Sequence, residues 1–312
     1  MESNDPRLLR RSDGLAHGYS DDELRRWCRN GALTRLRPGV YASSEDMARL
    51  DFAERHRVVA RATVQGLHTD AVLSHISAAA IYGLPIWNVD LSKVHVTRSG
   101  ATARSSSRIR THAVGIAPDQ IRIVDGLRVT TPARTIVDLG RLLPFEQAVV
   151  IGDAATRLEE GAVDVAPERH RHRRGAGAAR RVVSFVDGRS ESVGESRSRV
   201  AIHVAGLPAP SLQIDVLSVL GGWLARVDFL WEQFGVIGEF DGLGKYVRHL
   251  APGQTPGDVV VAEKLREDGL RAAGWTVVRW TWSDLAEPAA FLERLRRAFA
   301  TGSPRPSPTR PG

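Results

Sequence analysis

The chain has 312 residues, 42% of them hydrophobic, which is enough for two or three domains with buried cores. Its formal net charge of +7 and pI near 10.2 favour polyanionic partners, because neutralising phosphates releases condensed counterions. A single cysteine, Cys28, excludes an internal disulfide, and no apolar run approaches the roughly 20 residues that span a bilayer. With no signal-peptide pattern either, we expect a cytoplasmic protein without a membrane partner.

Residues 1–43 are predicted to form a helix followed by a basic two-stranded ribbon. Ser20 and Glu23 have the spacing of a capping box, which begins a helix that stops near Asn30. Alternating apolar and basic residues about a Pro-Gly turn then predict the ribbon, in the order of a winged helix. Five arginines are placed to contact phosphates or base edges: Arg25, Arg26, Arg29, Arg35 and Arg37. The alternative is a solvated helix face, and we favour DNA contact.

Residues 44–160 are predicted to be a mixed α+β region. Apolar periodicity and turn residues indicate these elements: helices at 49–66 and 74–82, strands at 94–97, 108–112 and 127–130, and a helix from Pro132 toward Leu143. His75, His95 and His112 are spaced too irregularly to indicate metal ligands, and we interpret them as structural histidines. The sequence shows no catalytic constellation here, so the region is expected to be scaffold.

Residues 161–190 are predicted to be a basic linker or exposed helix at a domain boundary. The run from Arg169 to Arg174 alternates Arg and His and is followed by Gly and Ala. Such a run is usually solvated, although it also suits a phosphate backbone. The tail, residues 301–312, is rich in Pro, Ser and Arg and is expected to be disordered because it cannot bury a core.

Residues 191–300 are predicted to alternate helices and strands around one sheet. The expected order is a helix opening at Ser192, strands at 212–217, 224–230 and 236–241, a helix at 263–273, a strand at 276–281 and a helix at 283–300. This pattern is typical of an α/β domain.

Three carboxylates are expected to converge on neighbouring strands of that domain. Glu239 and Asp241 are two residues apart on one strand, so their side chains share a face, and Asp228 lies on the strand before. Oxygen ligands with room for water suit Mg²⁺ or Mn²⁺. Asp228, Glu239 and Asp241 are therefore the predicted metal ligands, against the alternative of a solvated edge with ordinary ion pairs.

Lysine is scarce in this chain, and its positions are informative. Of the 43 basic residues only Lys93, Lys245 and Lys264 are lysine, and the last two flank the carboxylates. An ammonium beside metal-binding carboxylates is typical of metal-dependent phosphodiester hydrolysis. We predict Lys245 or Lys264 as the catalytic cation.

The C-terminal motifs resemble the restriction-endonuclease-like fold, the PD-(D/E)XK group, in its branch near the very-short-patch-repair endonucleases. The likeness rests on the strands bearing Asp228 and Glu239, on Glu-Phe-Asp-Gly with Lys245 after it, and on the closing Gly-Trp-Thr-Val-Val-Arg-Trp-Thr-Trp. It implies that Asp228 and Glu239 hold the metal and that Glu195 adds an acidic group from the first helix. Glu195 also has capping-box spacing from Ser192, so a structural role stays open.

One departure from that group concerns the lysine. The usual pattern has Lys two residues after the second carboxylate, where this chain has Asp241. An acidic side chain there cannot stabilise an attacking hydroxide, so Lys245 or Lys264 would have to reach the same point.

The first 160 residues resemble the AbiEi family of antitoxins, which begin with a winged helix. The motifs are Gly-Val-Tyr at 39–41 and Thr-Thr-Pro-Ala-Arg-Thr at 130–135. Together the two resemblances imply an α/β multi-domain protein: an N-terminal winged helix and mixed α+β region that bind DNA, joined to a restriction-endonuclease-like α/β sandwich that cleaves it with Mg²⁺ or Mn²⁺. The setting they imply is phage defence or a toxin-antitoxin-like system.

Two alternatives remain open from the sequence. In the first, the chain is a DNA-binding regulator or antitoxin whose nuclease fold serves only for binding or dimerisation, without catalysis. In the second, it mainly binds a partner toxin protein. The sequence is also compatible with a homodimer.

Overall fold

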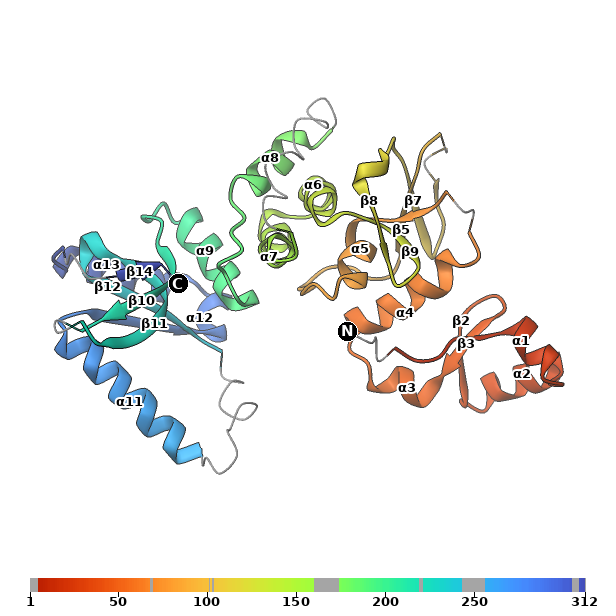
Figure 1. Cartoon of the computed structure of the whole chain (residues 1–312), viewed down its shortest axis with the longest axis horizontal. Helices are drawn as coiled ribbons and strands as arrows, with labels where there is room; N and C mark the ends of the chain where they lie inside the picture. Colours follow the sequence, from red (N-terminus) through yellow and green to blue (C-terminus); the bar gives the residue numbers. More distant parts are fainter. Residues whose placement is uncertain are drawn as a thin grey trace. The chain divides into compact units, whose positions relative to one another are not determined.

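The computed structural model describes residues 5–67, 70–100, 102, 104–159, 174–218, 221–242, 256–304 and 309–311. The chain divides into two compact units, Met1–Val186 and Asp187–Gly312 (Figure 1). The described residues form an α/β multi-domain fold with three sheets. None of the described helices combines the length and the apolar content needed to cross a bilayer.

The first unit begins with two helices and a small antiparallel sheet. Its elements are β1 (Leu9–Arg10), α1 (Arg11–Ala16), α2 (Asp21–Arg29), β2 (Leu33–Arg37) and β3 (Val40–Ser43), and the strand order is β1-β3-β2. The predicted capping box is confirmed, because Ser20 Oγ accepts from Glu23 N and the Glu23 carboxylate accepts from Ser20 N. Leu24 is the fully buried residue of α2, and the polar face of this helix stays in solvent.

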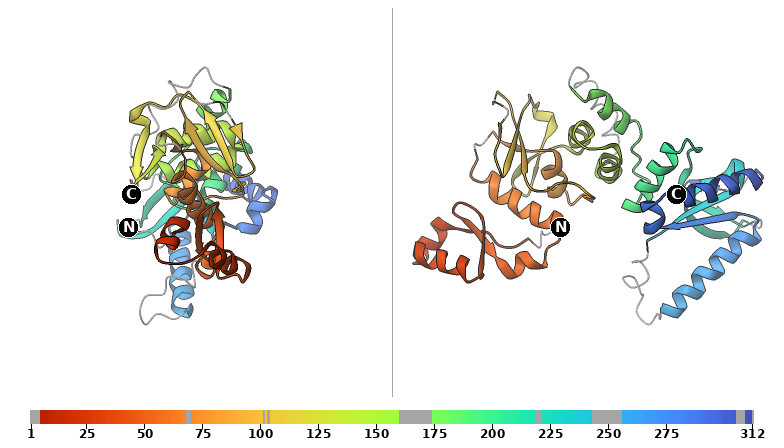
Figure 2. Two further views of the ribbon diagram at one scale, coloured as in Figure 1. Left: turned by 90° about the vertical axis from the view of Figure 1, so that its right-hand side faces the viewer. Right: turned by 180° about the vertical axis from the view of Figure 1, so that it is seen from behind.

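Helix α4 (Phe52–Val64) joins that small sheet to the rest of the unit. It follows α3 (Ser44–Arg49) and is capped at its start by Asp51. Val58 and Ala62 pack in a core with Leu36 of β2, whereas Ala60 packs in a second core under the next sheet. Figure 2 shows α4 running between the two sheets.

The second sheet of this unit has six strands in the order β6-β7-β5-β4-β9-β8. Its strands are β4 (Val72–Leu73), β5 (Val94–Arg98), β6 (Arg104–Ser105), β7 (Ile109–Ala113), β8 (Ile121–Val124) and β9 (Leu127–Thr130). Pairs β5·β7 and β4·β9 are parallel, and the other neighbours are antiparallel. Helix α5 (His75–Ile81) covers one face and is buried along its whole length.

Three further helices complete the first unit. They are α6 (Pro132–Leu142), α7 (Phe145–Thr156) and α8 (Ala176–Val183). Thr131 caps α6, with Pro132 at the first helical position as predicted. Helix α8 lies in the segment predicted as a linker, and it packs on α6 closely enough that a Cβ at Gly140 would lie 2.9 Å from the backbone of Ala179. Most of the Arg-His run, residues 169–173, lies outside the described residues.

The second unit is a sheet between two helical layers. Its elements are α9 (Val193–Val204), β10 (Ser211–Leu217), β11 (Trp223–Trp231), β12 (Val236–Asp241), α11 (Pro256–Ala272), β13 (Thr276–Thr281), α12 (Trp282–Ala286), α13 (Ala289–Thr301) and β14 (Thr309–Pro311). The strand order is β13-β12-β11-β10-β14, with β12 and β13 parallel and the others antiparallel. Helices α9, α12 and α13 cover one face and α11 the other (Figures 1 and 2).

Two sequence predictions about this unit were wrong. The single final helix predicted for 283–300 is two helices, because Pro288 lacks a backbone N–H and separates α12 from α13. The tail was expected to be disordered, but Thr309–Pro311 pairs with β10 and extends the sheet. A composition too polar for a core does not prevent backbone pairing at an open sheet edge.

Candidate functional site

In the centre of the second unit's sheet, strands β10 and β11 both change the face to which their side chains point. This change, here called the bend, occurs at Gln213 and Asp228. On β10, Leu212 packs on the α9 and α13 side, whereas Ile214, two residues later, packs on the α11 side. Residues two apart on a regular strand share a face, so β10 changes face at Gln213, whose φ of 52° is in the left-handed region. The facing strand β11 makes the same change across Asp228, between Val227 and Phe229.

A chain of hydrogen bonds occupies this bend. The Gln213 side-chain amide donates to Glu195 Oε2 at 3.0 Å and to Asp228 Oδ1 at 3.2 Å. The other oxygen of Asp228 accepts from the backbone N of Phe240 at 2.9 Å. Glu195 of α9 and Asp228 of β11 are thus both bonded to Gln213 of β10, and Asp228 is also bonded to β12.

Glu195 is held tightly by its own helix. Its Oε1 accepts from Ser192 Oγ at 2.7 Å and its Oε2 from Glu191 N at 2.8 Å, while Ser192 caps the backbone of Glu195. The residue is 3% exposed. The structural role weighed for it from the sequence is confirmed, because it belongs to the cap of α9, and its acidic role at a metal stays a prediction.

Glu239 lies on the opposite side of the sheet from Phe240 and faces α11. Arg266 Nη2 donates to Glu239 Oε2 at 3.1 Å, and Arg279 Nη2 lies 2.9 Å from the same oxygen. Arg266 Nη1 is 2.9 Å from Oε1 but does not make a hydrogen bond with it. This buried oxygen therefore has no hydrogen-bond donor among the described residues, and its charge is balanced by two guanidinium groups.

The structure does not gather all the predicted site residues. Asp241 ends β12 half-buried, Lys264 is exposed on α11, and Lys245 lies outside the described residues. Within the described part of the chain, no group of three potential ligands within 4.8 Å includes Asp228, Glu239 or Asp241. The bend turns Asp228 toward Gln213, while Arg266 draws Glu239 toward α11.

The predicted DNA-contacting arginines fall into two groups. Arg25, Arg26, Arg29 and Arg35 are exposed on α2 and β2. Arg25 lies 2.8 Å from Asp22 and Arg26 lies 3.9 Å from Glu23, in solvent-exposed pairs that contribute little and exchange readily for phosphate. Four arginines are therefore positioned to contact a polyanion.

Arg37 has a different role from the one predicted. It is half-buried, and its Nη1 donates to the carbonyl oxygens of Ala62 and Thr63 at the end of α4. Cations satisfy the unpaired carbonyls at helix C-termini. Arg37 therefore fastens β2 to α4.

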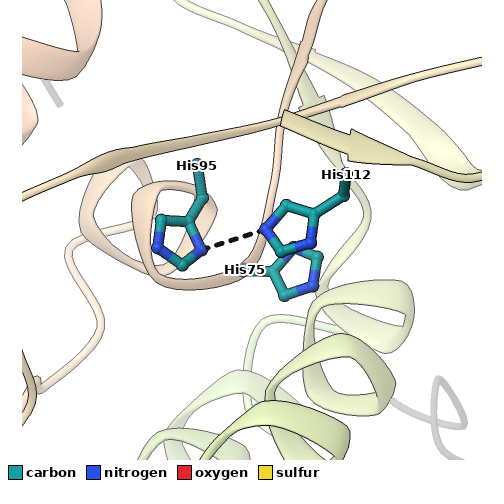
Figure 3. A group of neighbouring side chains, drawn as sticks. All are labelled: His75, His95 and His112. Atoms are coloured by element: carbon teal, nitrogen blue, oxygen red, sulfur yellow. Dashed lines mark hydrogen bonds between the residues drawn. The ribbon is translucent and has the colours of Figure 1, made fainter. Parts of the chain in front are cut away.

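The three histidines interpreted as independent structural residues come together. His75, His95 and His112 each offer a ring nitrogen within 4.8 Å of the others (Figure 3). Their sequence spacing could not predict this grouping, because strand pairing and the covering helix α5 bring them together.

Comparison with known proteins gives two similar chains, both from Mycobacterium tuberculosis: uncharacterized protein MT2308 of strain CDC 1551 / Oshkosh and uncharacterized protein Rv2248 of strain ATCC 25618 / H37Rv. Each is 32% identical over 275 residues, covering 86% of this chain and 93% of the mycobacterial protein. The chain belongs to their family. Since the similarity is longer than either compact unit, the family shares both units. No family model matches the chain.

Sequence reasoning missed three residues of the C-terminal site. Gln213, Arg266 and Arg279 contact the predicted carboxylates. Arg266 lies in the helix predicted at 263–273, and Arg279 is the one charged residue of the predicted strand at 276–281, which was a usable signal. Gln213 gave no signal, because its role depends on a backbone conformation that glutamine rarely adopts.

Proposed function

We propose that this protein binds duplex DNA through α2 and the β2–β3 hairpin and cleaves it with a metal-dependent nuclease site in the second unit. We place it in the cytoplasm, in phage defence or a toxin-antitoxin-like system. The observation that carries the nuclease proposal is the hydrogen-bonded chain from buried Glu195 through buried Gln213 to half-buried Asp228, with Glu239 on the strand next to Asp228. Removing acidic groups from water costs stability that their hydrogen bonds only offset, and such costly arrangements are expected at functional sites.

The donor chemistry fits a hard divalent cation. Asp228, Glu239 and Asp241 offer only oxygen, which Mg²⁺ and Mn²⁺ prefer, and Glu239 Oε1 keeps its lone pairs free of hydrogen bonds within the described residues. For these three residues to hold one ion, Glu239 would have to leave its ion pairs with Arg266 and Arg279, because the structure does not gather the three carboxylates at one point. When bound, the ion would polarise the scissile phosphate and lower the pKa of a water molecule.

Other residues of the chain orient Asp228 and supply positive charge near Glu239. Gln213 fixes one oxygen of Asp228 and the Phe240 backbone fixes the other, so the carboxylate has a single orientation. Arg266 and Arg279 supply positive charge beside Glu239, where Asp241 replaces the usual lysine. Preorganised charge of this kind stabilises a developing phosphorane without reorganisation.

A second function is favoured by the same arginines. Two guanidinium groups already neutralise Glu239, which is what a purely structural ion pair requires. On this reading the protein is a DNA-binding regulator or antitoxin, with the second unit as a binding or dimerisation module. A partner toxin would then engage the protein without any cleavage.

Calorimetric titration of Mg²⁺ into the full chain separates these functions. For a nuclease we expect Mg²⁺ uptake by the wild type that Glu239→Gln loses, because an amide oxygen carries no net charge for the ion. For a regulator the wild type should take up no Mg²⁺, and Glu239→Gln should only lower the melting temperature by leaving Arg266 without its partner. Asp215→Asn, on β10, is the matched control, and it should bind Mg²⁺ as the wild type does.

A further inference from the structure

Three histidines from separate elements meet on one face of the six-stranded sheet. His75 is the first residue of α5, His95 lies on β5 and His112 on β7. In the parallel pairing of β5 and β7, Thr97 is opposite His112, so His95 and His112 point to the same face two positions apart. Figure 3 shows the rings of His95 and His112 side by side and that of His75 against His112.

The spacing of two ring nitrogens matches that of ligands on a tetrahedral ion. His112 Nε2 and His95 Nδ1 lie 3.2 Å apart and share a hydrogen bond, so one of them carries a proton that an ion would displace. Zinc–nitrogen bonds of about 2.0 to 2.1 Å at the tetrahedral angle place two nitrogens roughly 3.3 to 3.4 Å apart. Both nitrogens can therefore bind one ion with almost no movement of either ring.

His75 completes the set after a turn of its ring. Its Nδ1 lies 3.0 Å from Ser74 Oγ, which leaves Nε2 as the nitrogen for an ion. The ring now stacks on His112 with centroids 3.6 Å apart and planes 14° from parallel. An ion in the plane of His112 lies outside the plane of His75, so binding includes rotation of His75 about its side-chain bonds.

Burial favours the neutral form of all three imidazoles. Burial lowers the pKa of His95 and of His112 to about 3 and holds the pKa of His75 well below its usual value. Neutral imidazole is the ligand form, so no proton charge opposes an ion at neutral pH. The charged groups that act on these rings are Arg110, Arg134, Arg141, Asp90 and Asp138.

A buried carboxylate lies near the His75 ring. Asp138 of α6 is 1% exposed, with Oδ2 2.9 Å from Arg134 Nε and 3.9 Å from His75 Nδ1. Its Oδ1 is buried without a hydrogen-bond partner among the described residues. Buried unsatisfied oxygens are rare, and a carboxylate behind a ligating histidine is the usual outer contact of a metal site.

The backbone of His75 is also held in a costly conformation. Its φ of 52° is in the left-handed region, which a residue with a Cβ adopts only where its surroundings impose it. This conformation begins α5 and directs the imidazole toward His95 and His112.

We propose that His75, His95 and His112 bind a divalent transition-metal ion of the Zn²⁺ class, with Asp138 as the outer partner of His75. Three imidazoles are a typical zinc ligand set that leaves a fourth position for water or another ligand. His112 is half-exposed, so the ion reaches the site from solvent. This site is separate from the oxygen-ligand site of the proposed nuclease and lies in the other unit.

The test uses the metal-free full chain without an affinity tag, titrated with Co²⁺ and Zn²⁺. We expect one Co²⁺ per chain with the intense visible absorption of tetrahedral coordination, displaced by Zn²⁺. His112→Gln, at the half-exposed ligand, should lose this absorption and bind at least about 100-fold more weakly, since even losing an outer partner costs about 10- to 100-fold. Asp138→Asn should weaken binding within that range.

His17→Gln is the matched control, because His17 is exposed at the end of α1 and remote from the cluster. It should bind Co²⁺ as the wild type does. Absence of tetrahedral absorption in the wild type, or equal binding by wild type and His112→Gln, would overturn the proposal. If His112→Gln does not fold, the wild-type titration decides alone, with one displaceable tetrahedral ion per chain as the required result.

Discussion

Replacing Asp228 by Asn should abolish DNA cleavage while DNA binding is kept. Asp228 is the carboxylate that Gln213 and the Phe240 backbone orient, and the substitution removes its charge with almost no change of shape. Losing one group that stabilises transition-state charge costs about 10² to 10³ in rate, and a metal-binding carboxylate should cost at least that much. The measurement is the initial rate of nicking of supercoiled DNA with Mg²⁺, beside the equilibrium affinity for a duplex.

The hydrogen bonds at the bend also predict a modest loss of stability in this variant. The new amide can present its oxygen to Phe240 N, but its NH₂ group then meets the donating amide of Gln213. Because both groups donate, the hydrogen bond between residue 228 and Gln213 is lost, and residue 228 is no longer connected to Glu195 through Gln213. Asp215→Asn is the matched control, because Asp215 accepts from the Trp223 indole on the same sheet. If Asp228→Asn cleaves as fast as Asp215→Asn, Asp228 is not part of the site.

The second large effect is expected at the N-terminal arginines. Replacing Arg25, Arg26, Arg29 and Arg35 by Ala should weaken duplex binding and flatten its salt dependence. Each lost phosphate contact lowers the slope of log affinity against log salt by about 0.9, so four contacts account for about 3.6. Between 50 and 200 mM salt the wild type should therefore lose about 10²-fold more affinity than the variant does. Fluorescence anisotropy at several salt concentrations measures both quantities.

A charge-matched control makes this result specific to the surface of α2 and β2. Replacing Arg49, Arg122, Arg128 and Arg297 removes the same total charge from exposed positions elsewhere. The control should bind DNA with nearly the wild-type slope. Equal slopes for the two quadruple variants would show that net charge, and not this surface, drives binding. Arg37 is left in place in both, because it fastens β2 to α4.

Local signals in the sequence predicted much of the fold. The Ser20 to Glu23 capping box, the Thr131-Pro132 start of α6 and the strand at 236–241 all lie where they were expected. Each of these signals is contained within a few residues, so no knowledge of tertiary structure is needed to read it. Pro288 was an equally local signal, and the prediction of one final helix disregarded it.

The arrangement of the sites could not be predicted in the same way. The left-handed backbone of Gln213 and the convergence of His75, His95 and His112 depend on strand pairing between distant segments. The sequence identified the carboxylates by residue type, but it could not show that Arg266 and Arg279 would hold Glu239. Arg37 was assigned from its charge alone, and only packing reveals that it binds the end of α4.

The central claim is metal-dependent hydrolysis of DNA, and cleavage by the purified wild-type chain tests it most directly. Single-stranded, nicked and supercoiled substrates are incubated with Mg²⁺ or Mn²⁺, with a chelator control, in the presence and absence of any partner encoded beside the gene. We predict that the metal ions convert supercoiled DNA to the nicked form and that the chelator stops the reaction. All three substrates remaining intact with either metal would contradict the nuclease proposal and leave the DNA-binding regulator in its place.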